Sequence, residues 1–260
     1  MQEANTVGPY FAWDYTGEPF HLFGLPHLVT LVLVVLGCVG LIIFRRRFSP
    51  RARRNWRYTM AALLVANEVV GHFWYWAVGA WSISFMLPLH MCSLFVWLTA
   101  IELVTGNRPL YEFTYFLGIG GALQALITPD LTIFGFPHYR FFQAFVMHAL
   151  IVWGSVFMTA VEGYRPTGKS LLRVAVRTNL YMLAILGINK LLGSNYLFIA
   201  GKPDMPSMLD LMAPWPWYIL EMEAVGAVVC LLLYLPFLIG DWLARRRREP
   251  VAGVPPTGTV

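Results

Sequence analysis

Residues 44–57 read FRRRFSPRARRNWR, and this arginine-rich stretch separates two long apolar stretches, residues 26–44 and 58–80. Five more apolar stretches follow along the chain, at residues 87–104, 111–128, 140–161, 171–191 and 216–240. Each is close to the ~20 residues that an α-helix needs to cross the hydrocarbon core of a membrane. The sequence therefore predicts an all-α polytopic membrane protein, built as a bundle of seven transmembrane helices.

The basic residues are unevenly divided among the connections between these stretches. Of the 19 Lys and Arg residues, 16 lie in or beside alternate connections and in the tail, while Arg140, Lys190 and Lys202 fall on the other side. Because cytoplasmic loops carry an excess of Lys and Arg, we expect the amino terminus outside and the carboxyl terminus in the cytoplasm. Seven spans independently require the two termini to lie on opposite sides of the membrane.

The composition indicates the same class of protein. Hydrophobic residues make up 58% of the chain and charged residues 13%, well below the roughly 25% charged residues of soluble domains. Since the arginines lie directly beside the apolar stretches, they are expected to bind anionic lipid headgroups, and nucleic acid is not expected as a partner.

Three regions are predicted along the chain. Residues 1–25 form an extracytoplasmic segment, which has no basic start and carries three acidic residues, so it does not resemble a secretory signal. Residues 26–240 form the transmembrane domain. Residues 241–260 form a basic cytoplasmic tail whose Pro-, Gly- and Thr-rich end is expected to be disordered.

The longest connection inside the domain, residues 194–215, is rich in Met and aromatic residues and runs into Pro214-Trp-Pro-Trp-Tyr218. Two interpretations stay open: a lid over a site, or an aromatic anchor at the outer membrane interface. The small residues of the stretch 111–128 predict close helix packing; they are Gly118, Gly120, Gly121, Ala122 and Ala125. The three cysteines all fall inside predicted helices, without the CxxC spacing of a zinc site.

Polar side chains at membrane depth need an explanation, because an ionisable group there costs ~2.5–3.5 kcal/mol even on the lenient insertion scale. They are Asn67, Glu68, His72, His90, Cys92, Gln124, Gln143, His148, Asn179, Asn189, Lys190, Glu221 and Glu223.

The predicted orientation gives these groups a depth. With a rise of ~1.5 Å per residue, Cys92 lies roughly 8 Å below the outer surface, His72 and His148 about 12 Å, and Glu68 about 18 Å. Gln124 and Asn189 lie within about two turns of that surface. The sequence therefore predicts a polar cluster in the outer half of the membrane.

Within this cluster, Glu68 and His72 are four residues apart and share a helix face, so the carboxylate is expected to orient the imidazole. His90 and Cys92 are about 200° apart around a helix and should not face one cavity. By depth, His148 is the better partner for Cys92, and a thiol beside an imidazole has the parts for nucleophilic acyl chemistry. The alternatives are that the thiol is inert packing and that the imidazole only links helices.

Four strings of sequence show a resemblance to a known family. Residues 87–93 read LPLHMCS, residues 136–143 read FPHYRFFQ with His148 beyond them, residues 189–198 read NKLLGSNYLF, and residues 214–218 read PWPWY. In these motifs, over about residues 11–238, the chain resembles the YwaF-like bacterial integral membrane proteins, which are similar to the animal transmembrane protein 164 family.

The resemblance implies a seven-helix protein of the bacterial plasma membrane and, from the animal branch, a phospholipid acyltransferase that uses Cys92 and His148. The expected substrate is a membrane phospholipid or lysophospholipid, and no cofactor or metal is expected. The stabilising groups for the oxyanion are expected among Gln124, Gln143 and Asn189, or the free amides at the start of the third helix. Supporting or substrate-binding roles are expected for Glu68, His72, His90, Gln124, Gln143, Asn189 and Asn195.

Three other functions stay open on the sequence alone. A metal-dependent intramembrane hydrolase would use His72, His90, His148 and Glu68, although no HExxH or HxxxH pair is present. A transporter would also place polar groups at depth, but it usually shows inverted repeats and broken helices near the midplane. A receptor or scaffold would use the polar groups only to hold helices together.

Overall fold

A computed structural model describes residues 8–203 and 207–246 of the chain. Its helices are α1 (Leu25–Phe44), α2 (Pro50–Ala77), α3 (Met91–Thr105), α4 (Arg108–Phe113), α5 (Ile119–Ile127), α6 (Tyr139–Ala160), α7 (Gly168–Leu192) and α8 (Tyr218–Arg246). A π-helical segment, η3 (Thr114–Gly118), joins α4 to α5, and short 3-10 turns occur at Pro9–Phe11, Arg45–Arg47, Tyr196–Phe198 and Met208–Leu211. The described residues contain no β-strand, so the all-α prediction is confirmed for them.

Five helical stretches are long and apolar enough to cross a membrane: Leu25–Arg47, Arg108–Ile127, Tyr139–Ala160, Gly168–Leu192 and Tyr218–Arg246. The other two predicted spans also coincide with helices but do not meet the same criteria. Helix α3 has only 15 residues, and α2 interrupts its apolar residues with Asn67, Glu68 and His72. The chain is therefore a multi-pass membrane protein, and the count of seven spans stays a prediction.

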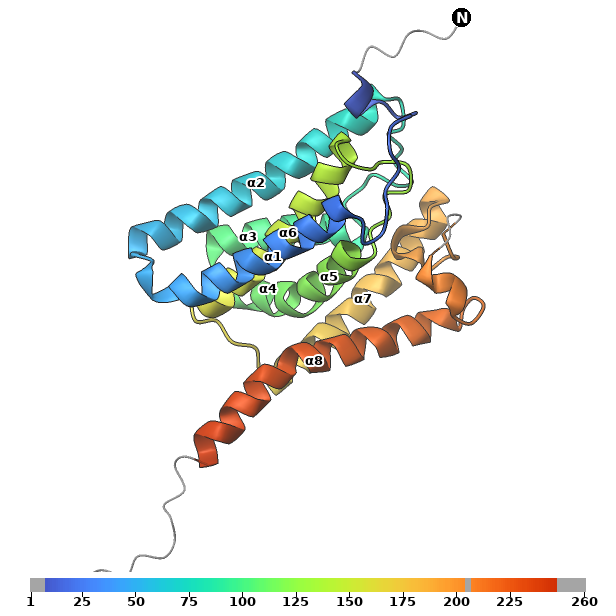
Figure 1. Ribbon diagram of the computed structural model, residues 1–260. Coiled ribbons are helices and arrows are strands. Elements are labelled where there is room, and N and C mark those ends of the chain that lie inside the picture. Colours follow the sequence, from blue (N-terminus) through green and yellow to red (C-terminus); the bar gives the residue numbers. More distant parts are fainter. Residues whose placement is uncertain (1–7, 204–206, 247–260) are drawn as a thin grey trace, which may run out of the picture.

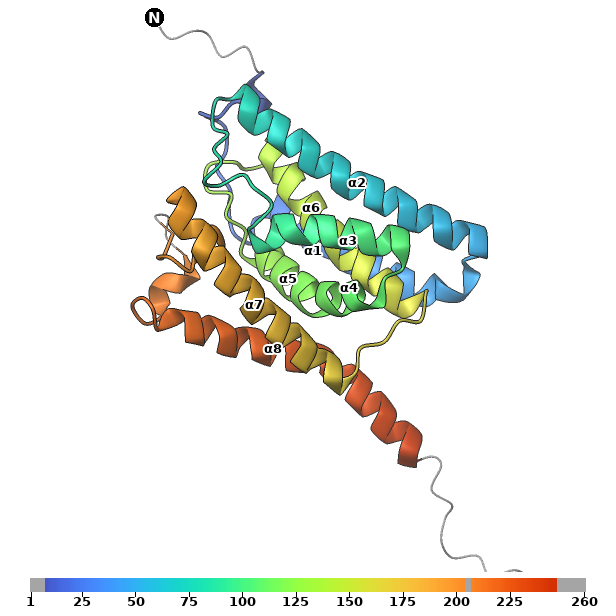
Figure 2. The same cartoon turned by 180° about the vertical axis from the view of Figure 1, so that it is seen from behind.

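Helix α6 is the centre of the fold. It packs against α1, α2, α3 and α5, and 78% of its most apolar 18-residue window is buried inside the protein. The hairpin of α7 and α8 lies beside this bundle, as the two opposite views show (Figures 1 and 2). None of the corresponding window of α8 is buried, so its apolar side chains face the surroundings, as expected for a helix in lipid.

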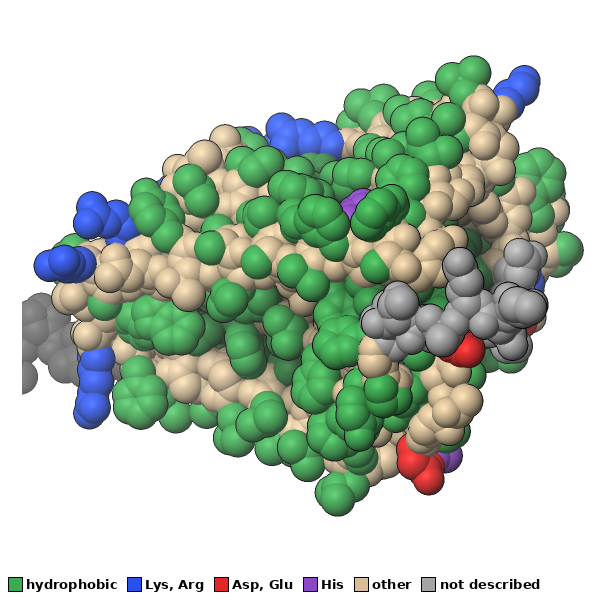
Figure 3. Space-filling view, turned by 90° about the horizontal axis from the view of Figure 1, so that it is seen from above, with side chains coloured by type: hydrophobic (Ala, Val, Ile, Leu, Met, Phe, Trp, Pro, Cys, Tyr) green, Lys and Arg blue, Asp and Glu red, His purple; other side chains and the backbone are tan. Residues whose placement is uncertain are grey.

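The two ends of the bundle differ in charge. We call the end where α1, α3, α6 and α8 finish the basic end, because the Arg45–Arg47 turn and Arg245 lie there. The other end, where α3 and α6 begin, is called the opposite end. In the view from above, hydrophobic side chains are spread over the whole face, and most of the visible Lys and Arg side chains lie toward its left side, which is the basic end (Figure 3). The predicted orientation would place this end in the cytoplasm.

Some helix boundaries differ from those predicted. Helix α2 begins at Pro50 rather than Tyr58, because Ser49 caps it by accepting a hydrogen bond from the Ala52 amide. Helix α3 begins at Met91 rather than Leu87. Residues 87–90 instead form a turn in which the Leu87 amide donates to the Tyr196 hydroxyl, 3.1 Å away.

The amino-terminal segment covers the opposite end of the bundle. The Trp74 indole donates to the carbonyl of Phe11 at 2.8 Å, and the Phe20 amide donates to the carbonyl of Thr132 at 3.0 Å. The described part of residues 1–25 is therefore packed against the helix ends. Residues 1–7 and the tail from residue 247 lie outside the described residues, so the predicted disorder of the tail stays a prediction.

Candidate active site

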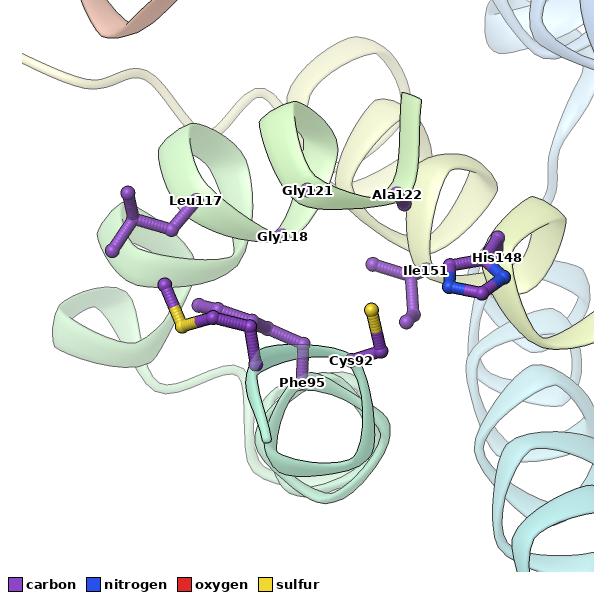
Figure 4. Close-up of a pocket in the computed structure, with 9 residues that line it drawn as sticks. Cys92, Phe95, Leu117, Gly118, Gly121, Ala122, His148 and Ile151 are labelled. Atoms are coloured by element: carbon purple, nitrogen blue, oxygen red, sulfur yellow. The ribbon is translucent and has the colours of Figure 1, made fainter. Parts of the chain in front are cut away.

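Helices α3 and α6 enclose a small cavity with the stretch formed by η3 and α5 (Figure 4). Its volume is about 10 Å³, which leaves room for about one water molecule. The lining residues are Met91, Cys92, Phe95, Leu117, Gly118, Gly121, Ala122, His148 and Ile151. The cavity therefore brings together the two residues that the sequence singles out for chemistry, Cys92 and His148, in a mostly apolar surrounding.

Small residues on η3 and α5 make room for this cavity. A Cβ atom at Gly118 would lie 3.3 Å from the Phe95 ring, and one at Gly120 would lie 3.0 Å from Val229 of α8. At Gly121, by contrast, a Cβ atom would meet nothing within 4 Å. The packing role predicted for the small residues thus fits Gly118 and Gly120, whereas Gly121 lines empty space.

His148 is held in one orientation. Its Nδ1 lies 2.7 Å from the carbonyl oxygen of Ala144, and since a carbonyl can only accept, Nδ1 carries the proton. The Nε2 atom then carries a lone pair. It is shielded from solvent and has no hydrogen-bond partner among the described residues. An unpartnered acceptor in a buried site is uncommon in proteins, and this one belongs to a residue that lines the cavity.

Cys92 is the second residue of α3, one turn nearer the start of the helix than predicted. Its sulfur and the His148 ring lie toward the same end of the cavity, and the Ile151 side chain is drawn between them (Figure 4). No side chain caps the start of α3, so the amides of its first turn have no intrahelical partner. The thiol is therefore close to unused backbone N–H donors and to the positive end of the helix dipole.

Glu68 and His72 lie side by side on α2, as their spacing predicts, with His72 Nε2 3.7 Å from Glu68 Oε1. The Trp81 indole donates to His72 Nδ1 at 3.1 Å, which leaves the proton of the ring on the nitrogen that faces Glu68. Glu68 is buried and also bonds to Ser93, the residue that follows Cys92. The pair does not line the cavity, and Glu68 contacts α3 through Ser93.

Gln143 and His90 lie outside the cavity lining. Gln143 is buried and accepts a hydrogen bond from the Arg140 guanidinium. His90 is the residue before α3, and its ring packs against the rings of Tyr196 and Phe198 at 5.0 and 5.3 Å between centroids. His90 and Cys92 thus face different surroundings, as expected, but the predicted 200° does not apply because His90 lies before the helix.

The three remaining predicted residues also lie away from the cavity. Asn189 is buried and bonds through its amide to the backbone of Tyr196 and to the Ser194 hydroxyl. Asn195 donates to the carbonyl of Gly201 at 2.8 Å, and Gln124 is exposed on α5. The two asparagines therefore shape the start of the connection 194–215, which packs on the beginning of α3 through Tyr196.

Sequence reasoning missed a second buried carboxyl group, Glu102 on α3. It is fully buried, and its Oε2 accepts a hydrogen bond from the Thr114 hydroxyl of η3 at 2.5 Å. Its Oε1 has no partner among the described residues. Glu102 lies near the end of a predicted span, where a carboxylate is commonly solvated, so its position alone did not mark it as a group at depth.

The histidines proposed for a metal site do not come together. His72 bonds to Trp81, His90 packs on Tyr196, and His148 lines the cavity. Within residues 8–203 and 207–246, no three His, Cys, Asp or Glu side chains are grouped so that they would hold a metal ion.

Comparison with known proteins gives one match. The model of the TMEM164 family matches residues 22–234 of the chain, which include every helix from α1 to α7 and most of α8. No curated protein and no solved structure matches the sequence. With more than three quarters of its residues covered by the family model, the chain belongs to the TMEM164 family.

Proposed function

We propose that this protein is a lipid-modifying enzyme that transfers or hydrolyses the acyl chain of a phospholipid through a thioester on Cys92. The single observation that carries the proposal is the cavity shared by Cys92 and His148, in which His148 Nε2 has no other partner among the described residues. Membership of the TMEM164 family, as well as the five apolar helices, supports a lipid as substrate.

The chain supplies the nucleophile and the base that the reaction needs. His148 Nε2 takes the proton from Cys92 Sγ, and the thiolate attacks the carbonyl carbon of a phospholipid ester. The bond between that carbon and the glycerol oxygen breaks, and the oxygen leaves with the proton held by His148. A hydroxyl group of a lysolipid, or water, then attacks the thioester with His148 as base and releases the Cys92 thiol.

The negative charge on the ester oxygen in the transition state needs hydrogen-bond donors. The amides in the first turn of α3, including that of Cys92 itself, are the nearest donors without an intrahelical partner. Gln124, Gln143 and Asn189 lie outside the cavity, so we favour these amides. An ester group is larger than the cavity, and we expect the flexible Met91 side chain to move when substrate enters.

The site also fits the predicted topology of seven spans with the amino terminus outside. The 15 residues of α3 extend only ~22 Å, which is less than the ~30 Å of a hydrocarbon core. The turn before α3, and with it Cys92, would therefore lie below the outer surface of the membrane, at the depth of lipid ester groups. We propose a bacterial plasma membrane as the location.

The test is to incubate purified protein with a phospholipid that carries a labelled acyl chain. We expect a hydroxylamine-sensitive adduct in the wild type, its loss in Cys92→Ser, and a loss of at least about 100-fold in rate in His148→Gln, as for removal of a general base. Cys38→Ala and Cys230→Ala are the matched controls, because both remove a cysteine outside the cavity lining, and both should keep the adduct.

The covalent mechanism is wrong if wild type and Cys92→Ser give the same lipid products and neither carries an adduct. An adduct that disappears in Cys230→Ala but persists in Cys92→Ser would move the nucleophile to another helix.

A further inference from the structure

Arg140 is the second residue of α6, at the opposite end of the bundle. Its guanidinium carbon lies 5.3 Å from the ring centre of Tyr75 and 6.0 Å from that of Trp74, both on the last turns of α2. The guanidinium also donates to the side-chain oxygen of Gln143, one turn further along α6. The side chain therefore lies between α2 and α6 at this end of the bundle.

Two donors at this place have no acceptor among the described residues. Arg140 Nε and the Tyr139 hydroxyl are both shielded from solvent, and neither has a hydrogen-bond partner there. Buried donors are nearly always bonded, and an unpaired donor costs about 1–3 kcal/mol. Both side chains lie against the Trp74 ring, so a ligand with several acceptor oxygens bound there would satisfy the two donors.

Arg140 has no direct ion-pair partner within the part of the chain that the structure describes, although the Glu68 carboxylate is near enough to interact with its charge. None of the ion pairs there includes Arg140. The nearby carboxylate of Glu68 is directed to His72 and Ser93 instead. A guanidinium with free donors in a poorly solvated place binds a phosphate well, because the planar fork matches two phosphate oxygens.

The distance from Arg140 to the cavity fits one class of ligand. His148 follows Arg140 by eight residues, about 12 Å along the helix axis, and a ligand bound at both places spans this distance less about 3 Å of hydrogen-bond contact at each end. In a glycerophospholipid the phosphate and the nearest ester carbonyl are roughly 6–7 Å apart, given single bonds of about 1.5 Å. A phosphate at Arg140 would thus place an ester group at Cys92 and His148.

We propose that Arg140, together with the Tyr139 hydroxyl, binds the phosphate of a glycerophospholipid and positions its ester at the cavity. The positioning role of Arg140 rests on the proposed function, because it presupposes the acyl-transfer reaction. Binding of the phosphate can be measured without that reaction. We expect the protein to prefer lipids with a phosphate to neutral lipids with the same acyl chains.

The test uses the full chain with Cys92→Ala, so that no acyl transfer takes place, and native mass spectrometry in detergent. Phosphatidylglycerol and diacylglycerol with identical chains are titrated in parallel. We expect Arg140→Gln to weaken phosphatidylglycerol binding about tenfold, as for loss of a charge-assisted hydrogen bond, and to leave diacylglycerol binding unchanged. Arg140→Lys should lose less, and Tyr139→Phe, which keeps the ring against Trp74, should lose a few fold.

Arg108→Gln is the matched control, since Arg108 also begins a helix and also lies over a tyrosine ring, Tyr164, at 5.2 Å. It should bind both lipids as the wild type does. Equal weakening of both lipids by Arg140→Gln would mean a structural role and would overturn the proposal, as would no change for either lipid. Binding of inorganic phosphate as tight as that of phosphatidylglycerol would overturn the lipid assignment.

The same titration separates this proposal from the proposed function. A tenfold loss in Arg140→Gln, with no Cys92 adduct in the wild type, keeps the phosphate site and rejects the thioester. An adduct in the wild type, with no effect of Arg140→Gln on binding, rejects the phosphate site and keeps the thioester.

Discussion

At the scale of single residues, the chemistry of the candidate site depends on which nitrogen of each histidine carries a proton. The Ala144 carbonyl fixes this for His148, and the Trp81 indole fixes it for His72. In both rings the other nitrogen faces the proposed reaction centre or its neighbour, Glu68. The backbone and one indole thus determine the state of two side chains that the sequence could identify only by type.

His138, which caps α6, gives a residue-scale prediction. Its Nδ1 accepts from the Arg140 amide at 3.1 Å, and its Nε2 donates to the carbonyl of Ala12 at 3.1 Å. Burial of the ring lowers the pKa of His138 below its ordinary value. The unfolded chain therefore takes up a proton more readily than the folded one, so stability should fall as the pH drops below about 6.5.

Thermal unfolding in detergent between pH 7.5 and pH 5 would measure this effect. His138→Asn keeps an acceptor for the cap but does not titrate, so its melting temperature should depend less on pH than that of the wild type. Equal slopes for the two proteins would contradict the prediction.

Thr114 gives a second residue-scale prediction, because its hydroxyl is the one hydrogen-bond donor to Glu102 among the described residues. Thr114→Val keeps the shape of the side chain and leaves both oxygens of a fully buried carboxyl group without a donor. We expect a loss of about 1–3 kcal/mol in unfolding free energy. In Thr30→Val, where the hydroxyl lost donates to the Pro26 carbonyl of its own helix, the change should stay within about 0.5 kcal/mol. Similar losses in both variants would contradict the role of Thr114.

The site residues were only partly predictable at this scale, for physical reasons. The arginine pattern gives the orientation of each helix, and the rise per residue of a helix then gives the depth of each residue below the outer surface. These depths were enough to pair Cys92 with His148, because the rise per residue does not depend on packing. Whether Gln124 or Asn189 faces the same space depends on the rotation of each helix about its axis, and packing with other helices sets that rotation. Arg140 was assigned only to the outer side, since its contact with Tyr75 depends on how α2 and α6 pack.

At the scale of helices, the crossing of α1 and α6 depends on one glycine. A Cβ atom at Gly37 would lie 2.5 Å from the Trp153 ring, whose indole donates to the Val34 carbonyl at 2.9 Å. Gly37→Ala should therefore force the two helices apart and cost about 1–3 kcal/mol by overpacking.

Gly40→Ala is the matched control, because it lies one turn further along α1 and a Cβ atom there would meet nothing within 4 Å. It should be neutral, or more stable by up to about 1 kcal/mol, through the better helix propensity of alanine. Chemical unfolding of both variants in the same detergent measures the difference, and equal stability would show that α1 and α6 adjust without cost.

The helices themselves were largely predictable, because each apolar stretch coincides with a helix, while their ends were not. The apolar pattern places the arginines of residues 51–57 in a connection, but they occupy the first turns of α2, where Ser49 and Pro50 provide a start signal. The beginning of α3 was placed too early because the bonds that hold the turn at residues 87–90 come from Tyr181 and Tyr196. Those partners are about 100 residues away in sequence, and no local sequence pattern predicts these contacts.

At the scale of the whole molecule, the α7–α8 hairpin is attached to the bundle by apolar contacts, such as that between the rings of Phe237 and Tyr115, and by polar contacts. Arg173 pairs with Glu112 of α4, and Tyr181 donates to the Leu89 carbonyl at 2.9 Å. Arg165, in the connection before α7, pairs with Asp241 of α8 at 2.6 Å. Some of the arginines expected at lipid headgroups are therefore bonded within the protein, so they contribute to its assembly as well as to its orientation.

The predicted orientation can be tested on a variant whose three cysteines are replaced by alanine. Glu18→Cys and Arg46→Cys each put one thiol at an exposed position, at the opposite end and the basic end of the bundle respectively. In intact cells, a membrane-impermeant thiol reagent should label Glu18→Cys and leave Arg46→Cys unlabelled until the cells are lysed. The reverse pattern would invert the topology and place the cavity in the inner half of the membrane.

The π-helical segment at residues 114–118 makes the site sensitive to the length of the chain as well as to its chemistry. A π turn holds one residue more than the α turn it replaces, and one residue corresponds to about 100° of rotation. If one residue were deleted from this segment, every apolar side chain and every arginine elsewhere would stay unchanged. Either α4 or α5 would nevertheless turn by about a quarter of a circle, which would carry Thr114 away from Glu102 or Gly118 and Gly121 away from Cys92.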